Sequence, residues 1–207
     1  MADRSTLVLH IKAAQKGDGE AFARLVEPFE ARLYQLALGI TGNHEDAEDA
    51  WQNALLRAWK SIGRVKDSEA FRSWISRIVV NECRRVLRSR ISRGISGGRS
   101  RAVSIPDGEH QVALGLDGSV DGEAMGATQD VTHEVVDQMA VLSHLQALPQ
   151  EQRETLLLRF WLDMPLQDVA RVTGVPLSTA KSRLYRGLEA LEPLLKREGF
   201  GHGGSSR

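Results

Sequence analysis

A row of polar side chains in the middle of the sequence has the chemistry to bind a polyanion. The row recurs at i, i+4, i+7 and i+11, on one side of a helix, and consists of Arg77, Asn81, Arg84 and Arg88. Guanidinium groups bind phosphates, and an Asn amide can hydrogen-bond a base edge. Glu82 is the only acidic residue of this helix after its first turn, whereas hydrated helix faces more often alternate both charges. The pattern favours nucleic acid as the partner.

The distribution of charge along the chain supports this interpretation, although the formal net charge is zero. Residues 57–101 carry thirteen Arg or Lys and three acidic residues, and residues 102–154 carry one against ten. Such polarity indicates that one face meets a strongly anionic partner. Most charge runs only keep a surface hydrated, but this one lies on a periodic helix. Residues 61–71 directly precede that helix and could hold an extruded base.

The tryptophans near this helix allow two interpretations. As exposed rings, Trp51, Trp59 and Trp74 would be stacking platforms for unpaired bases. At this spacing most tryptophans are core residues, and Trp51 shares a helix face with Ala47 and Ala54. The core interpretation is the stronger of the two.

A second candidate DNA-binding element lies near the C-terminus, where two predicted helices meet at a glycine. Gly174 can adopt the left-handed conformation that a sharp reversal requires. Ser178 or Thr179 can cap the helix that follows. On that helix Thr179, Ser182 and Arg186 point away from the apolar stripe. This layout is typical of a helix-turn-helix whose second helix enters the major groove, although glycine-cornered helical hairpins also occur without DNA.

A third surface is acidic. Asn43 can cap a helix over residues 44–62, whose inward positions are mostly Ala and Trp. The side chains expected to point outward are Glu45, Asp46, Asp49, Gln52, Asn53 and Leu56. Acids in a first turn favour the helix dipole, which accounts for Glu45 and Asp46 but not for Asp49 or for an exposed leucine. We expect a protein-docking face here.

The elements that must position these residues are helices, since nearly every periodic segment has helical spacing. We predict an all-α fold of two small helical domains joined by a flexible linker. Residues 90–130 are rich in Gly, Ser and acidic residues, which is typical of a linker, and residues 199–207 predict a disordered tail. Pro28 should kink or restart the second helix. The expected helices span 7–16, 19–39, 44–62 and 69–89 in the N-terminal block, with a C-terminal block over 131–198.

Several classes of protein are disfavoured by composition. The single cysteine, Cys83, leaves no internal disulfide, and the six His are scattered without ligand spacing. We therefore expect no metal, no cofactor and no enzymatic activity. No apolar run reaches the roughly 18 residues of a membrane span, and the N-terminus lacks a signal-peptide pattern. We expect no membrane insertion and a cytoplasmic location.

Three segments carry a resemblance to a known family, namely GDGEAFARLVEPFEARLYQLALGITGNHEDAEDAWQNALLRAW, FRSWISRIVVNECRRVLR and LPQEQRETLLLRFWLDMPLQDVARVTGVPLSTAKSRLYRGLEAL. In these segments the chain resembles an extracytoplasmic-function (ECF) sigma factor, the minimal class of bacterial RNA polymerase sigma subunit. The resemblance covers well over half of the chain, in the family's order and spacing. One departure is that Asn53 follows Gln52, where the family usually has an acid, and a second is the long Gly-rich linker.

The resemblance implies domains and partners. Residues 1–89 would be region 2, which binds core polymerase and reads and melts the −10 element, and residues 131–198 would be region 4, which reads the −35 element. The implied partners are core RNA polymerase, through its beta-prime and beta subunits, promoter DNA as duplex and melted single strand, and an anti-sigma factor.

The resemblance also implies roles for individual residues. Those implied for −10 binding are Arg64, Lys66, Arg77, Asn81, Arg84, Arg85 and Arg88. Those implied for −35 binding are Ser178, Thr179, Lys181, Ser182, Arg183 and Arg186. Those implied for core polymerase binding are Asp46, Asp49, Gln52, Asn53 and Leu56. A stand-alone helix-turn-helix regulator is the main alternative, but it leaves the acidic helix unexplained.

Overall fold

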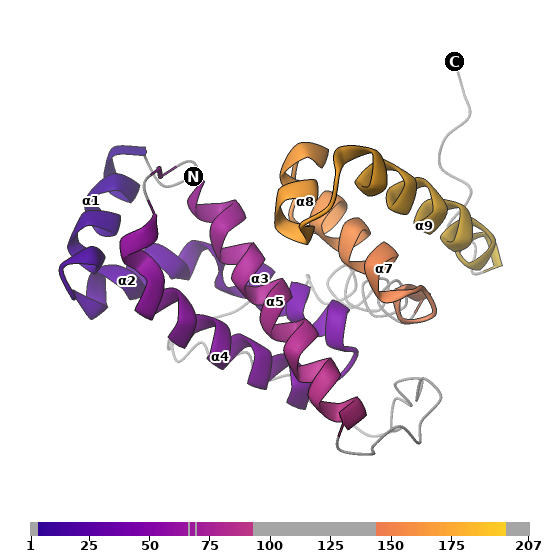
Figure 1. Ribbon diagram of the computed structural model, residues 1–207, viewed down its shortest axis with the longest axis horizontal. Coiled ribbons are helices and arrows are strands. Elements are labelled where there is room, and N and C mark those ends of the chain that lie inside the picture. Colours follow the sequence, from indigo (N-terminus) through magenta and orange to yellow (C-terminus); the bar gives the residue numbers. More distant parts are fainter. Residues whose placement is uncertain (1–3, 66, 69, 93–143, 198–207) are drawn as a thin grey trace, which may run out of the picture.

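The computed structural model describes residues 4–65, 67–68, 70–92 and 144–197. Within that part of the chain every regular element is a helix, and none is a strand. The helices form two groups (Figure 1), the N-terminal block up to Ser92 and the C-terminal block from His144 onward. The predicted all-α class with two helical domains is therefore confirmed. Most of the predicted linker, residues 90–130, and all of the predicted tail, residues 199–207, lie outside the described residues.

The N-terminal block is a bundle in which the two longest helices, α4 and α5, pack against each other and against α3. Helix α5 ends three residues beyond the end that the sequence pattern predicts. The elements are α1 (Arg4–Gln15), α2 (Gly19–Val26), the 3-10 turn η1 (Glu27–Phe29), α3 (Glu30–Thr41), α4 (His44–Ser61), the 3-10 turn η2 (Ile62–Arg64) and α5 (Phe71–Ser92).

Local signals in the sequence account for the helix boundaries of this block. Asp18 accepts a hydrogen bond from the Ala21 backbone N at 3.0 Å, which caps α2. Pro28 lies in the 3-10 turn between α2 and α3, so the predicted restart at this proline is confirmed. Gly42 ends α3 with a φ of 80°. Asn43 caps α4 as predicted, by accepting from the Asp46 backbone N at 2.9 Å.

The C-terminal block contains the predicted pair of helices that meet at a glycine. Its elements are α7 (Gln150–Leu156), a π-helical turn η3 (Leu157–Trp161), α8 (Leu166–Thr173) and α9 (Leu177–Arg197). Gly174 follows α8 in the left-handed region with a φ of 76°, as the sharp reversal requires. The prediction that Ser178 or Thr179 caps the next helix is wrong. Because α9 already begins at Leu177, both residues lie within its first turn.

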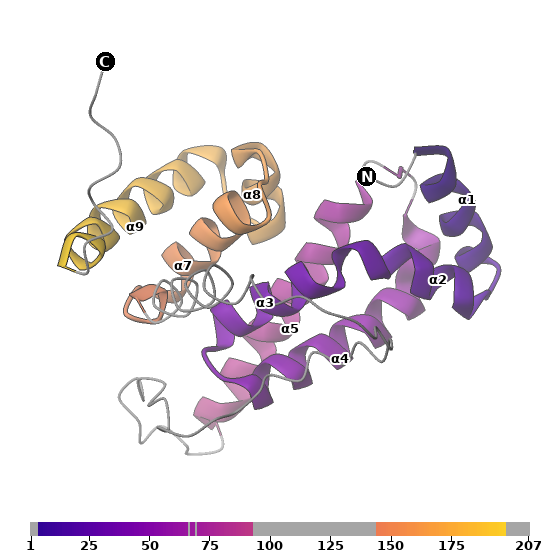
Figure 2. The same ribbon diagram turned by 180° about the vertical axis from the view of Figure 1, so that it is seen from behind.

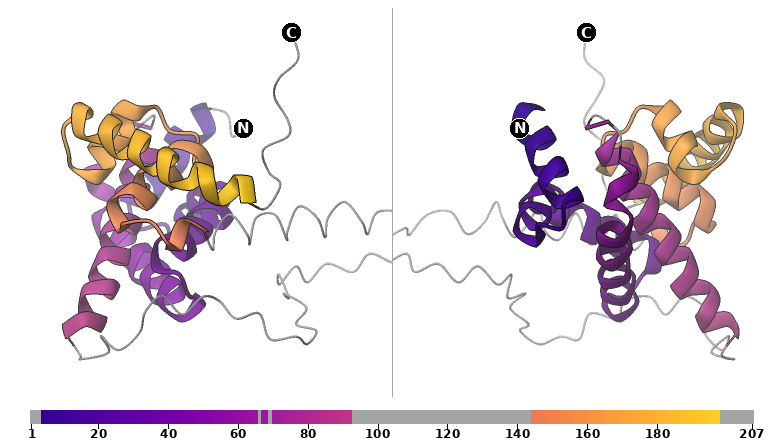
Figure 3. Two further views of the ribbon diagram at one scale, coloured as in Figure 1. Left: turned by 90° about the vertical axis from the view of Figure 1, so that its right-hand side faces the viewer. Right: turned by 60° about the vertical axis from the view of Figure 1, so that its left-hand side comes forward.

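The two blocks share one continuous hydrophobic core. Helix α5 packs against α8, and α3 packs against α7 and η3. Figures 1, 2 and 3 agree that α9 lies on the side of the C-terminal block that faces away from the N-terminal block. Trp51 is buried, and Trp59 and Trp74 are half-buried against the core. The core interpretation of these tryptophans is the one that the packing favours.

Candidate nucleic-acid and protein-binding surfaces

Helix α9 presents a polar face to solvent, which we call the α9 face. Its side chains are Ser178, Lys181, Ser182 and Arg186, all exposed, with Thr179 and Arg183 half-buried at its edge. The opposite side of the helix is held in the core by Ala180, Leu184 and Leu191. No ion pair to the basic residues of this face occurs among the described residues. The α9 face therefore combines accessible positive charge with hydroxyl groups, the chemistry that contacts phosphates and base edges.

Tyr185 belongs to the α9 face, although it was not predicted. It lies three residues after Ser182 and four after Lys181, and it is 67 % exposed. An aromatic ring with a hydroxyl group can donate to a phosphate and pack against a base. Helical periodicity alone would have placed Tyr185 on this side, but an aromatic residue in an amphipathic helix more often belongs to the core.

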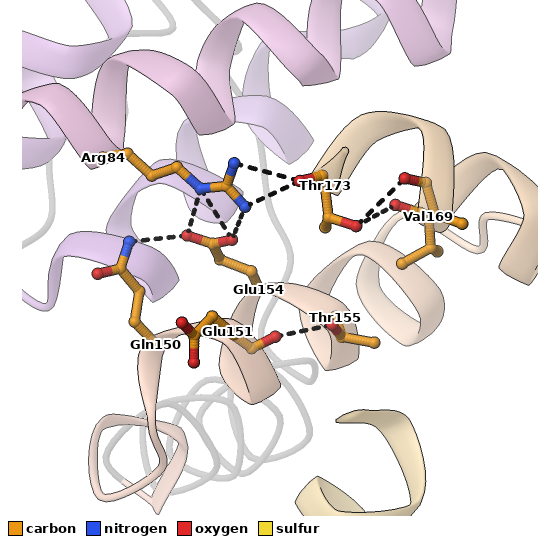
Figure 4. Close-up of polar contacts among 8 residues, drawn as sticks. Arg84, Gln150, Glu151, Glu154, Thr155, Val169 and Thr173 are labelled. Carbon is orange, nitrogen blue, oxygen red and sulfur yellow. Dashed lines mark hydrogen bonds and ion pairs between the residues drawn. The ribbon is translucent and has the colours of Figure 1, made fainter. Parts of the chain in front are cut away.

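Three of the four residues in the predicted row on α5 are exposed, namely Arg77, Asn81 and Arg88. Arg84 is different, since only 23 % of its side chain is accessible. Its guanidinium meets the carboxylate of Glu154 on α7, with the closest nitrogen–oxygen pair at 2.5 Å (Figure 4). The structure thus places the predicted row on one helix, with its third member joined to the C-terminal block.

Arg85, also predicted to bind DNA, takes part in an ion-pair cluster around Glu82. The Glu82 carboxylate is buried and meets Arg57 of α4 at 2.6 Å and Arg85 at 3.2 Å. Both arginines are more than half exposed, so they neutralise the buried carboxylate while their outer edges stay in water. Glu82 therefore links α4 to α5 through Arg57.

The loop before α5 is fixed at its start by the N-terminal helix. Gln15 of α1 donates its side-chain amide to the carbonyl oxygens of Ile62 and Val65, at 3.3 and 2.8 Å. Arg64 is exposed on the η2 turn. Lys66, the other loop residue predicted to bind DNA, lies outside the described residues.

The acidic face of α4 is only partly as expected. Asp49, Gln52 and Leu56 are exposed, Leu56 by 58 %, and Asn53 is half-buried with its amide donating to the Asp49 carbonyl at 2.7 Å. These four residues form what we call the α4 face.

Asp46 does not belong to this face, and the prediction that it points outward is wrong. It is 7 % exposed, because its carboxylate binds the Asn43 side chain and forms an ion pair with Arg90 near the end of α5. Arg90 lies outside the predicted helix, so the sequence pattern offered no partner for Asp46.

Burial shifts the pKa of two groups near the contact between the blocks. Desolvation raises the pKa of the Cys83 thiol, and the negative charge of Glu154 raises it further. Desolvation lowers the pKa of the Arg153 guanidinium, while Glu154 acts in the opposite direction. Neither group lies on an exposed polar face. No set of three or more His, Cys, Asp or Glu side chains in the described part of the chain could hold a metal ion.

Family models match both blocks. The model described as Sigma-70 region 2 matches residues 25–92, and the one described as Sigma-70, region 4 matches residues 138–191. The chain is 31 % identical to the ECF RNA polymerase sigma factor SigM of Mycobacterium tuberculosis, over 94 % of this chain and 85 % of that protein. It is 29 % identical to the ECF sigma factor SigW of Bacillus subtilis, over 90 % of this chain and 95 % of that protein.

Two solved structures have a fold similar to that of this chain. The structure of CnrH in complex with the cytosolic domain of CnrY has a TM-score of 0.62 at 21 % identity, and covers 92 % of this chain and 97 % of CnrH. The sigma factor RpoE in complex with the anti-sigma factor NepR, from Bartonella quintana, also has a TM-score of 0.62, at 23 % identity over 84 % of this chain and 96 % of RpoE. At these sequence identities, the two structures support the fold alone.

The chain therefore belongs to the sigma-70 family, and within it to the ECF RNA polymerase sigma factors. Members of this family are transcription initiation factors that bind DNA for promoter recognition, and they are not themselves enzymes. In the described residues, no helix is both long and apolar enough to cross a membrane.

Proposed function

We propose that the protein binds core RNA polymerase through the α4 face and directs it to promoters by reading two DNA elements. In this proposal the α9 face reads the −35 element as duplex, and the row on α5, with Arg64, Lys66 and Arg85, reads the −10 element and holds its melted strand. The observation that carries the proposal is the exposed polar α9 face directly after the Gly174 turn, in a chain whose two blocks match the two sigma regions.

Each surface has the chemistry that its role requires. The α9 face offers donors to base edges and phosphates on a helix whose opposite side is fixed in the core. Arg77, Asn81 and Arg88 on α5 are accessible to a DNA backbone. The exposed Leu56, surrounded by polar groups, is typical of the apolar centre of a protein-docking surface.

The protein performs no bond chemistry in this mechanism. Polymerase would hold both DNA-reading helices in one complex, which raises their joint affinity without new contacts. Capture of an unstacked base near residues 61–71 would offset about a few kcal/mol of unstacking. The proposal places the protein in the cytoplasm, where polymerase acts, and adds an anti-sigma partner, as the structure of RpoE with NepR suggests by its similar fold.

Run-off transcription tests the proposal most directly. Bacterial core polymerase with the purified protein should start transcription from a selected subset of a randomised promoter library, and core polymerase alone should not. Tight and specific promoter binding by the isolated protein, with no transcription when core polymerase is added, would instead support a stand-alone regulator.

A matched pair of leucine variants tests the docking surface. Leu56→Asp should weaken binding to core polymerase by about 2 kcal/mol, since a charge in the apolar centre of an interface removes a main contact. Leu9→Asp is the control, because Leu9 on α1 is similarly exposed, at 65 % against 58 % for Leu56, but lies outside the proposed surface. Equal affinities of the two variants, measured by titration with labelled polymerase, would contradict the assignment.

A further inference from the structure

One buried carboxylate holds an arginine from each of the two longest helices of the N-terminal block. The Glu82 side chain on α5 is only 1 % exposed. The Nε atom of Arg57, on α4, lies 2.6 Å from Oε1 of Glu82. The Nη1 atom of Arg85, on α5, lies 3.2 Å from Oε2. Each carboxylate oxygen therefore has its own guanidinium, and the two guanidinium groups are brought together where α4 packs on α5.

Both arginines keep donors that Glu82 does not use. A guanidinium has five N–H groups, and each of these two turns one edge to the carboxylate. The Arg57 and Arg85 side chains are 58 % and 57 % exposed, and neither has another ion-pair partner in the part of the chain that the structure describes. The cluster therefore combines a net positive charge with N–H groups that are open to solvent.

The cluster lies beside the exposed part of the row on α5. Arg85 follows Asn81 by four residues and precedes Arg88 by three, so these three share one side of the helix. Asn81 and Arg88 are exposed, whereas Arg84 is turned into the C-terminal block. The accessible basic surface of α5 therefore continues through Arg85 toward α4, where Arg57 extends it.

Glu82 restrains the direction of both arginines. A buried carboxylate without a countercharge is strongly unfavourable, so the pairing with the arginines is retained. Because a guanidinium is planar, the edge turned to Glu82 determines where the opposite edge points. An arginine also loses conformational freedom when it binds a phosphate, and a side chain that is already held loses less. Glu82 therefore prepares the outer edges of Arg57 and Arg85 to bind an anion.

We propose that Arg57 and Arg85 form a phosphate site for the backbone of the promoter strand that the row on α5 holds, with Glu82 as its positioning residue. The inference rests on the proposed function, because it takes that row as the −10-reading surface, and it adds Arg57 of α4 to the surface. A phosphodiester offers two oxygens that share a negative charge, which suits guanidinium N–H groups. Backbone contacts carry no direct sequence information, so the site contributes affinity rather than selectivity.

The first test compares Arg57→Gln with Arg24→Gln in holoenzyme reconstituted from bacterial core polymerase and the full-length protein. The two arginines are 58 % and 59 % exposed and each pairs with a glutamate, but Arg24 lies on α2, outside every proposed surface. The probe is a fluorescent promoter selected from the randomised library, with its −10 strand unpaired. Arg57→Gln should weaken binding about fivefold and lower the slope of log affinity against log salt by about 0.7. Arg24→Gln should change neither quantity.

Two further measurements distinguish a phosphate contact from other roles of Arg57. On promoters with substituted −10 bases, Arg57→Gln should lose affinity by the same factor, because a phosphate contact does not distinguish bases. Its affinity for labelled core polymerase should equal that of the parent, although Leu56 of the α4 face is its neighbour in the sequence. A loss confined to one −10 sequence, or a defect only in binding core polymerase, would overturn the inference.

Glu82→Gln tests the positioning role, because two roles of this carboxylate predict opposite results. If Glu82 only reduced the positive charge of the surface, its neutralisation would tighten promoter binding. If Glu82 positions the arginines, the same change should weaken binding about threefold. In the Glu82→Gln background, Arg57→Gln should then have little further effect. Unchanged or tighter binding by a folded Glu82→Gln protein would overturn the positioning role.

Arg57→Lys keeps the inference testable if Glu82→Gln does not fold. Lysine retains the positive charge and can still pair with Glu82, but its single ammonium group cannot turn separate edges to a carboxylate and a phosphate. Arg57→Lys should therefore weaken promoter binding about threefold with little loss of unfolding free energy. Parent-like binding in Arg57→Lys and Arg57→Gln alike would overturn the phosphate site. Failure of the proposed function would appear elsewhere, as a parent protein that starts transcription from no promoter of the library.

Discussion

The two candidate DNA-reading helices differ in how they are covered. Helix α9 is held on one side by its own block and leaves its polar side open. Helix α5 is the central element between the blocks, packing on α3, α4 and α8, and one arginine of its row is bound to Glu154. A basic residue on a helix face is therefore not always free to bind DNA, because a carboxylate far away in the sequence can form an ion pair with it.

The largest expected effect comes from a substitution in the open face. Arg186→Ala should weaken duplex DNA binding by the free protein by about 1–3 kcal/mol and reduce the slope of log affinity against log salt by about one, as a lost arginine contact does. Arg84→Gln should not weaken it, because Arg84 is already bound to Glu154. Titrations at several salt concentrations measure both quantities, and equal losses in the two variants would remove the distinction between the helices.

The next largest effect is a loss of unfolding free energy on substituting two glycines. One substitution strains the backbone of its own block only, and the other also disturbs the contact between the blocks. Gly42 and Gly174 each follow a helix at positive φ, 80° and 76°, so alanine at either should cost about 1–2 kcal/mol of unfolding free energy. A Cβ at Gly174 has no heavy atom within 4 Å, whereas one at Gly42 collides with the Gln146 side chain. Gly42→Ala should therefore also loosen the contact between the blocks.

Denaturant unfolding and small-angle scattering together distinguish the two glycine variants. Both should have lower midpoints of unfolding, and only Gly42→Ala should have a larger radius of gyration. A larger radius of gyration in Gly174→Ala would mean that strain in the turn between α8 and α9 reaches the contact between the blocks. That result would contradict the distinction between the covered helix α5 and the open helix α9.

Local features of the sequence were enough to predict most of the fold. Helical spacing, the Asn43 cap and the left-handed glycine at 174 act within a few residues, so their consequences can be read from short segments. The α9 face was predicted for the same reason, since its exposure depends on the helix that carries it. Tyr185 was missed because the face was identified by its hydroxyl and basic side chains, and an aromatic residue was not sought there.

Long-range pairs were not predictable in this way. Arg84 and Glu154 lie 70 residues apart, and Asp46 and Arg90 lie 44 apart. Periodicity indicates which side of a helix a residue occupies, but not which other element covers that side. Asp46 was therefore expected on the surface and is buried, and Arg84 was expected to be as open as Arg88.

The smallest expected effect concerns the cysteine beside Arg84. Burial and the charge of Glu154 raise the pKa of the Cys83 thiol above its unfolded value of about 8.5, so the folded protein keeps a proton that the unfolded chain loses at higher pH. The resulting stabilisation is fully present below that unfolded value and is lost as the pH rises above it. Between pH 8 and 9.5 the loss should be about 1 kcal/mol.

Cys83→Ala isolates this contribution, because every other titrating group is common to both proteins. The difference in unfolding free energy between parent and variant should change with pH in the stated direction, and a constant difference would show that the thiol is not buried in solution. The rate of Cys83 alkylation also distinguishes helix α5 from helix α9. Since Glu154 contributes to the pKa shift, Glu154→Gln should speed iodoacetamide labelling of Cys83, whereas Arg186→Ala on the open helix should leave the rate unchanged.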